Sequence, residues 1–242
     1  MLLYKMISKE GNRSHNEDYT TMKREGAHYC FVLADGLGGH GKGEVASQCV
    51  GDTAVELLST EYEIQDYLNV AFMKSQKTLM NQQVELHAEN EMKTTMVVLA
   101  CDDNTIQWGH IGDSRLYYFQ DNKLQTRTMD HSVPQMLVAS GEIKEKNIRN
   151  HPDRNKLLRV MGQEWESPRY ELGEPIQCRG KQAFLLCSDG FWELITEKKM
   201  QSCLKKAKSP EDWLESMEQI VLKNGRNKDM DNYSAIAVWC DN

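Results

Sequence analysis

Short acidic motifs are the parts of this 242-residue chain that could carry chemistry. Two apolar runs each end in an aspartate that a glycine follows at once, in Asp35-Gly36 and Asp189-Gly190. A strand that ends in a carboxylate holds that group on a rigid element, and the glycine allows a sharp turn and leaves its carbonyl open to a ligand. The pattern therefore predicts two sites at strand ends where carboxylate and carbonyl oxygens are available to a ligand.

Further acids occur in Glu17-Asp18, in Asp113 of the GDSR motif and in Asp231, which Asn232 follows. Carboxylates that a fold brings together repel one another unless a cation lies between them. Because the set offers oxygen ligands and no Cys/His ligand pattern, Mg²⁺ or Mn²⁺ is favoured over Zn²⁺. A site of several aspartates that holds two such ions is suited to hydrolysis of phosphate esters by water.

Two cationic side chains adjoin these acids. Arg13 begins the RSHNED motif, and a guanidinium there is suited to clamp a phosphoryl group with two hydrogen bonds. His40 follows a glycine pair, and an imidazole near a phosphate could protonate a leaving oxygen. Ser114 and Ser188 also stand beside acids, but neither has a G-x-S-x-G motif or an obvious partner base, which disfavours a serine hydrolase.

The glycine-rich loop from Gly36 to Gly43 also resembles two nucleotide-binding signatures. Its glycines match G-x-G-x-x-G, and its spacing to Lys42 matches most of a P-loop. However, residue 43 is glycine where a P-loop needs serine or threonine, and Asp35 would place a negative charge beside the phosphates. A nucleotide-binding protein is therefore a disfavoured alternative. A catalytically silent regulatory or binding module is a second alternative, and the complete set of acids disfavours it.

Composition restricts the class of partner. The formal net charge of −7 argues against a nucleic acid, which needs a basic face. No apolar run approaches the ~20 residues of a membrane helix, and the N-terminus lacks the apolar core and cleavage site of a signal peptide. We therefore expect a cytoplasmic protein that does not use the membrane. The seven cysteines are scattered without a CxxC pair, which indicates buried reduced thiols.

The hydrophobic pattern predicts an α+β fold. We expect helices at 44–59 and 64–88, near 133–140, and from Pro210 after an N-cap at Ser209. A regular βαβ alternation is absent, which favours largely antiparallel sheets. Strands are expected where apolar, β-branched and aromatic residues gather: 2–8, 29–34, 94–101, 105–111, 115–119, 182–187 and 234–240.

Two further expectations concern the connections. The segments 105–111 and 115–119 flank the tight GDSR turn, which predicts a hairpin. The charged and irregular segment 129–180 is typical of an insertion that lies over the main body.

The motifs, taken in order, resemble the protein phosphatase 2C (PP2C or PPM) family of metal-dependent serine/threonine phosphatases, and its bacterial branch most closely. The resemblance covers nearly the whole chain. The blocks that carry it, in the order and at the spacing of the family, are GNRSHNED, FVLADGLGGHGKGEVAS, TTMVVLACDD, WGHIGDSRLYYF, DHSVPQMLVASGEI, HPDRNKLLRVMG, FLLCSDGFWELI and DNYSAIAVW.

The resemblance implies one domain over 1–242, a four-layer α/β/β/α sandwich in which two antiparallel sheets carry helices on their outer faces. It also implies a metal cluster at one edge of that sandwich. Asp35 would bridge two Mn²⁺ or Mg²⁺ ions, and the carbonyl of Gly36 would help hold the second. Asp189 and Asp231 would hold the first ion. Asp113, together with Asp189, would contribute to a third ion found in bacterial relatives.

Around these ligands, the resemblance implies that Glu17 and Asp18, with Asn232 beside them, orient waters at the metals. Arg13 would bind the substrate phosphate. His40 lies three residues beyond the position at which some members carry a histidine, so its role as a proton donor stays open.

The implied function is hydrolysis of phosphoserine and phosphothreonine by a metal-activated water. The implied substrates are phosphoproteins made by a serine/threonine kinase, and family analogy implies a monomer. Residues 131–162 would form a flap beside the active site.

Overall fold

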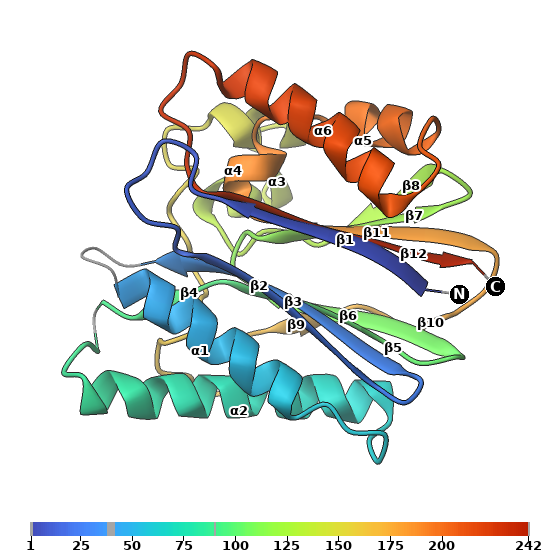
Figure 1. Cartoon of the computed structure of the whole chain (residues 1–242). Helices are drawn as coiled ribbons and strands as arrows, with labels where there is room; N and C mark the ends of the chain where they lie inside the picture. Colours follow the sequence, from blue (N-terminus) through green and yellow to red (C-terminus); the bar gives the residue numbers. More distant parts are fainter. Residues whose placement is uncertain (1, 38–41, 90, 242) are drawn as a thin grey trace.

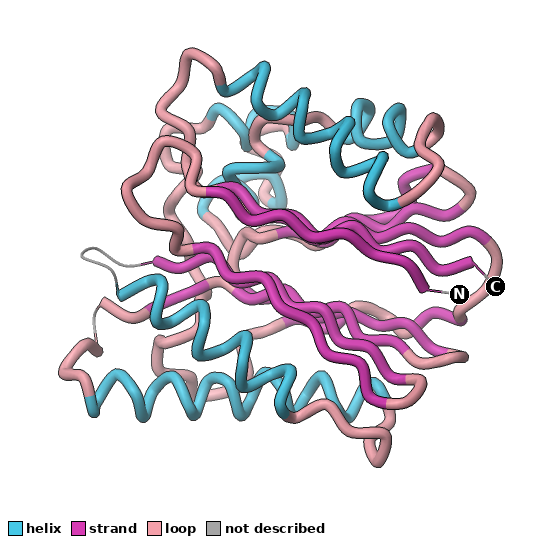
Figure 2. The backbone as a smooth tube through the Cα atoms, viewed as in Figure 1, coloured by secondary structure: helices cyan, strands magenta, loops and turns pink. Residues whose placement is uncertain are grey.

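The apolar segments pair into two antiparallel sheets that pack face to face, with helices on both outer faces (Figure 1). This computed structural model describes residues 2–37, 42–89 and 91–241. Figure 2 shows the two layers of strands between the two layers of helices. The predicted α/β/β/α sandwich is therefore confirmed.

The strand order of the first sheet is β1-β12-β11-β7-β8, and that of the second is β10-β6-β5-β3-β2. Two short strands join the second sheet, since β4 pairs with β3 and β9 pairs with β6. The bounds in the first sheet are β1 (Leu2–Lys9), β7 (Arg115–Gln120), β8 (Lys123–Arg127), β11 (Lys181–Cys187) and β12 (Tyr233–Asp241). Those in the second are β2 (Asp18–Glu25), β3 (His28–Leu37), β4 (Lys93–Thr94), β5 (Met96–Cys101), β6 (Thr105–Ile111), β9 (Glu171–Leu172) and β10 (Ile176–Gln177).

The helices divide between the two faces. The long pair α1 (Lys42–Glu56) and α2 (Ile64–Glu85) covers the second sheet, as expected from 44–59 and 64–88. The first sheet is covered mainly by the late helices α4 (Asp189–Trp192), α5 (Glu197–Leu204) and α6 (Pro210–Gly225). The segment 131–162 contains α3 (Val133–Ala139) and the 3-10 helix η2 (Glu145–Asn150). The hydroxyl of Ser209 accepts the N–H of Asp212 and caps α6, as predicted.

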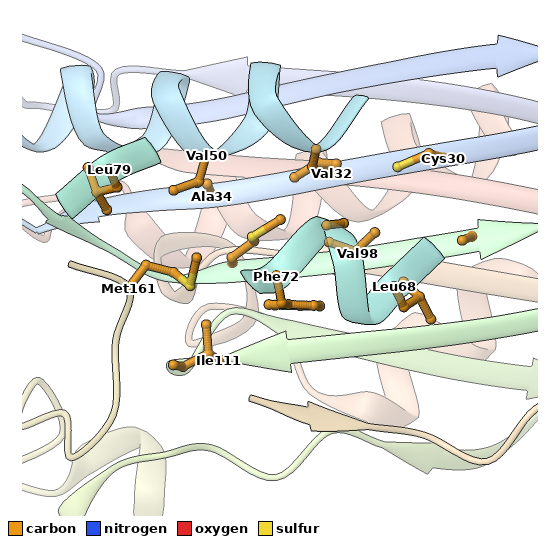
Figure 3. Packing of buried hydrophobic residues seen from close by; sticks show 14 of the residues in the cluster. Cys30, Val32, Ala34, Val50, Leu68, Phe72, Leu79, Val98, Ile111 and Met161 are labelled. Atoms are coloured by element: carbon orange, nitrogen blue, oxygen red, sulfur yellow. The ribbon is translucent and has the colours of Figure 1, made fainter. Parts of the chain in front are cut away.

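Strand alternation builds three apolar layers, because successive side chains of a strand face opposite sides of the sheet. Along β3, Phe31 and Leu33 face the first sheet and pack in the central layer. Val32 and Ala34 point the other way and pack beneath α1 and α2 (Figure 3). A third cluster lies between the first sheet and α4–α6. Each of the three interfaces between adjacent layers of the sandwich thus has its own apolar core.

The predicted hairpin around GDSR is wrong. Strand β6 pairs within the second sheet and β7 within the first, so the turn between them passes the chain from one sheet to the other. The interpretation of 129–180 as an insertion is also wrong for residues 171–177, because β9 and β10 pair with β6.

Among the described residues, none of the helices combines the length and apolar content that a membrane crossing requires.

Candidate metal centre

The predicted acids lie at one end of the sandwich because the strands that carry them end or begin there. Asp35 lies near the end of β3, and the register of the β2–β3 pair places Asp18 directly opposite it. Asp189 follows β11, and Asp231 lies two residues before β12, the neighbour of β11 in the first sheet. Asp113 sits in the turn that joins the two sheets. Antiparallel pairing therefore brings together residues that are far apart in the chain.

Asp35, Asp113, Asp189 and Asp231 line one cleft with a volume of about 820 Å³. The sequence-predicted residues in its wall are Arg13, Glu17, Asp35, Gly36, Asp113, Asp189, Asp231 and Asn232. Sequence reasoning missed Ser14, His15, Leu37, Glu44, Asn155 and Leu157. The signal that could have identified Glu44 is its place in the sequence, since it is an acid in the first turn of the helix that follows the Asp-Gly motif. Asn155 and Leu157 belong to the flap, and nothing local in the sequence links them to the acids.

Asp18, a predicted residue, does not line the cleft. Asp18 is buried behind the cleft, 6% exposed, where its Oδ2 accepts the hydroxyl of Ser188 at 2.7 Å. Its Oδ1 has no hydrogen-bond partner among the described residues. His40 falls in 38–41, outside the described residues, so its predicted role is not tested.

The electrostatics of the cleft oppose full ionisation of its acids. Burial, and then the charges of Asp18 and Asp189, raise the pKa of Asp35 well above its usual range. Burial, and then the charge of Asp113, do the same for Asp189. Burial, followed by the charge of Asp130, raises the pKa of Asp113 to about 7. A site whose carboxylates resist ionisation together is one that a cation would stabilise.

Arg13 contacts this group of acids directly through Asp231. Its Nε and Nη2 donate to the two carboxylate oxygens of Asp231 at 3.0 and 3.1 Å, and its Nη1 lies 3.6 Å from Asp229. The hydrogen bonds to Asp231 raise the pKa of the guanidinium further. The side chain is 47% exposed, so it borders both the acids and the solvent at the cleft.

The loop that carries Arg13 is held by hydrogen bonds between the side chain of Asn232 and backbone atoms of the loop. The amide of Asn232 donates to the carbonyls of Glu10 and His15, both at 2.9 Å, and its Oδ1 accepts the N–H of Glu17 at 2.9 Å. Asn232 therefore shapes the loop. Gly36 is required for a similar reason: a Cβ there would overlap the carbonyl of Gly43 and approach that of Glu17 to 2.8 Å.

The residues fit divalent cations. The cleft offers carboxylate and carbonyl oxygens, which suit hard ions such as Mn²⁺ and Mg²⁺. The raised pKa values of Asp35 and Asp189 agree with this fit, because burial and then neighbouring carboxylates disfavour their ionised forms, and a bound cation would offset that charge repulsion.

The topology disfavours both nucleotide signatures. The strand before the glycine-rich loop, β3, pairs antiparallel with β2 and β5. Dinucleotide-binding and P-loop sites occur instead at the ends of parallel strands in βαβ units.

Comparisons with known proteins agree with this geometry. A family model described as "Protein phosphatase 2C" matches residues 8–233. The serine/threonine phosphatase stp of Listeria welshimeri is 34% identical over 208 residues, which cover 81% of this chain and 80% of the relative. The crystal structure of the Mycobacterium tuberculosis serine/threonine phosphatase PstP matches with a TM-score of 0.86 at 28% identity and covers 100% of this chain and 99% of that one. A structure of the catalytic domain of PstP with two manganese ions matches at 27% identity with a TM-score of 0.83, over 99% of each chain.

Proposed function

This chain belongs to the protein phosphatase 2C family and is a metal-dependent serine/threonine phosphatase, and we propose that Asp35, Asp189 and Asp231 hold its two Mn²⁺ or Mg²⁺ ions. The carbonyl of Gly36 would contribute to this pair of sites, and Asp113 together with Asp189 would hold a third ion. The observation that carries the proposal is the convergence of these groups on one cleft, in which burial and neighbouring carboxylates raise the pKa of Asp35 and of Asp189.

The ions, when bound, supply positive charge to the transferring phosphoryl group and activate the attacking water. The protein supplies orientation and further charge. Arg13 borders the cleft, and its guanidinium is suited to bind two phosphate oxygens at once. Glu17 in the cleft wall and Asp18 behind it accept hydrogen bonds from water, and Asn232 keeps their loop in place.

The substrates we propose are phosphoproteins modified by a serine/threonine kinase, in the cytoplasm, with the enzyme acting as a monomer. We further propose that 1–242 is a single domain and that 131–162 forms a flap beside the active site. The flap proposal is supported by Asn155 and Leu157, which line the same cleft as the acids of the strand ends. A phosphorylated segment that enters the cleft would therefore contact the flap. His40 stays a predicted proton donor.

Phosphate release from a phosphothreonine peptide tests this function, measured with Mn²⁺, with Mg²⁺ and with EDTA. We expect activity that requires either metal and disappears with the chelator. Asp103→Asn, at an exposed position in the turn before β6, is the matched control and should leave activity unchanged. If the folded protein releases no phosphate with any metal, the catalytically silent alternative replaces this proposal.

A further inference from the structure

The turn between β6 and β7 places Asp113, and its backbone is unusual. Gly112 has a φ of +100°, and a Cβ at this position would lie 2.6 Å from Cγ2 of Thr95. The following side chain, Asp113, is 5% exposed. Since a carboxylate in a buried turn can move little by itself, the direction in which it points depends on what holds the turn.

His131 holds the turn on one side. Its backbone N–H donates to the carbonyl of Gly112 at 2.9 Å, and the N–H of Gly112 donates to its ring Nδ1 at 3.2 Å. The ring stacks on His110 with 4.6 Å between centroids and 16° between planes. The Nε2 of His110 in turn contacts the carbonyl of Met129 at 2.7 Å. Because Nδ1 of His131 accepts the N–H of Gly112, it must carry a lone pair and not a proton.

Trp192 holds the turn on the other side. Its Nε1 donates to the carbonyl of Asp113 at 3.0 Å. The guanidinium of Arg115 lies 3.4 Å from the centre of the indole ring and makes two hydrogen bonds to Asp130, at 2.7 and 2.6 Å. Asp130 immediately precedes His131, so adjacent residues at the start of the flap support both contacts.

We propose that His131 and Trp192 are positioning residues, which fix the backbone of Gly112 and Asp113 so that the Asp113 carboxylate faces the third cation. This inference rests on the proposed function, and specifically on Asp113 as a ligand. His131 would then act by orienting the carboxylate of Asp113 and would not contact the substrate.

The same histidine belongs to a group that could itself hold a metal. Ligand atoms of His110, His131 and Glu171 lie within 4.8 Å of one another. However, the Gly112 N–H occupies the lone pair on Nδ1, so the neutral ring carries its proton on Nε2. That nitrogen faces Oε1 of Glu171 at 3.2 Å, and Arg159 also donates to Oε1, at 2.9 Å. A neutral His131 has no lone pair left for a cation, which favours positioning over ligation.

Replacement of His131 by two different residues separates these roles. In His131→Asn the amide oxygen takes the place of Nδ1 and can accept the Gly112 N–H, while Nε2 is lost. His131→Leu removes both. Mn²⁺ binding by calorimetry is the direct readout. We expect His131→Leu to weaken the weakest Mn²⁺ step about tenfold, as is typical when a group that orients a ligand is lost, and His131→Asn to restore most of that affinity.

The hydrogen bond from Trp192 to the carbonyl of Asp113 allows an independent test. Trp192→Phe keeps an aromatic ring beneath Arg115 but removes the donor to Asp113, and should also weaken the weakest Mn²⁺ step. Trp213→Phe is the matched control, because Trp213 is a buried tryptophan whose Nε1 donates to the carbonyl of Met200 at 3.0 Å, in the helical layer. It should leave all Mn²⁺ steps unchanged. If His131→Leu does not fold, His131→Asn and Trp192→Phe still decide the question.

Three results would overturn the inference. One is wild-type Mn²⁺ affinity in both His131→Leu and Trp192→Phe. Another is the complete loss of a Mn²⁺ site in His131→Asn, which would mean that the histidine group ligates a metal. The third is a wild-type protein that binds only two ions. In each case Mn²⁺-dependent phosphate release by the wild-type protein would leave the proposed function standing, and its absence would show that the function itself is wrong.

Discussion

Replacement of Asp113 by asparagine tests whether the acids of the cleft destabilise the metal-free protein. Asp113 is 5% exposed, and its burial together with the charge of Asp130 raises its pKa from an ordinary 3.8 to about 7. The folded state then favours the protonated carboxyl, so stability is lost as the pH rises from 3.8 through 7. Asparagine has nearly the same shape and no charge, so it should remove this loss.

The magnitude follows from the size of the pKa change. A rise from 3.8 to about 7 sets an upper limit of ~4 kcal/mol, at ~1.4 kcal/mol per pH unit. The amide of asparagine also loses hydration on burial, so we expect about half of this limit, ~2 kcal/mol. For a chain of this length, that gain corresponds to a rise in Tm of about 4–8 °C.

The assay is thermal unfolding in EDTA at about pH 8 and about pH 5. Asp113→Asn should raise Tm at the higher pH and have a much smaller effect at the lower one, where only the first part of the loss between pH 3.8 and about 7 has occurred. With saturating Mn²⁺ the order should reverse, because the variant has lost a ligand. Asp103→Asn should change neither value. An equal gain at both pH values, or no gain in EDTA at pH 8, would refute the electrostatic reasoning.

The remaining predictions concern the proposed ligands and clamp. Asp189→Asn should reduce kcat by orders of magnitude through loss of metal, and an unchanged kcat at saturating Mn²⁺ would remove Asp189 from the ligand set. Arg13→Ala should raise KM for a phosphopeptide more than it alters Mn²⁺ affinity by calorimetry; a wild-type KM would reject the clamp. Gly36→Ala should lower the Tm of the metal-free protein, because the added methyl group overlaps the carbonyl of Gly43, and an unaltered melting curve would show that the loop can move aside.

The sequence predicts the central strands and the acids well, because their signals are local. Asp35 and Asp189 each follow an apolar run and precede glycine, and those patterns need no knowledge of the partner strand. Among the strands that sequence reasoning missed, β2 and β8 both lie at sheet edges. Their side chains are partly exposed and mostly polar, so they lack the continuous apolar run of a central strand.

The hairpin error has a different cause. The segments before and after GDSR have the apolar pattern of paired strands, and the short turn is compatible with a hairpin. A turn, however, specifies only that the chain reverses. It does not specify which of the two sheets the next strand joins, and an apolar strand can pack in either sheet. The positive φ of Gly112 and its close approach to Thr95 take the chain across to the other sheet. That contact joins distant segments, and no local pattern could reveal it.

The buried ion pair of Arg115 and Asp130 gains a physical explanation from this crossing. Arg115 is 1% exposed and Asp130 is 5% exposed, and an isolated ion pair at such depth stabilises a fold little, because each charge loses its hydration. The pair nevertheless fixes the plane of the Trp192 ring and the start of the flap at once. Apolar side chains of equal volume could fill the same space, but they would not set the direction of the Trp192 N–H toward Asp113. The arrangement therefore favours the direction of one carboxylate at the expense of stability, and it joins that carboxylate to the start of the segment 131–162, from which Asn155 and Leu157 line the cleft.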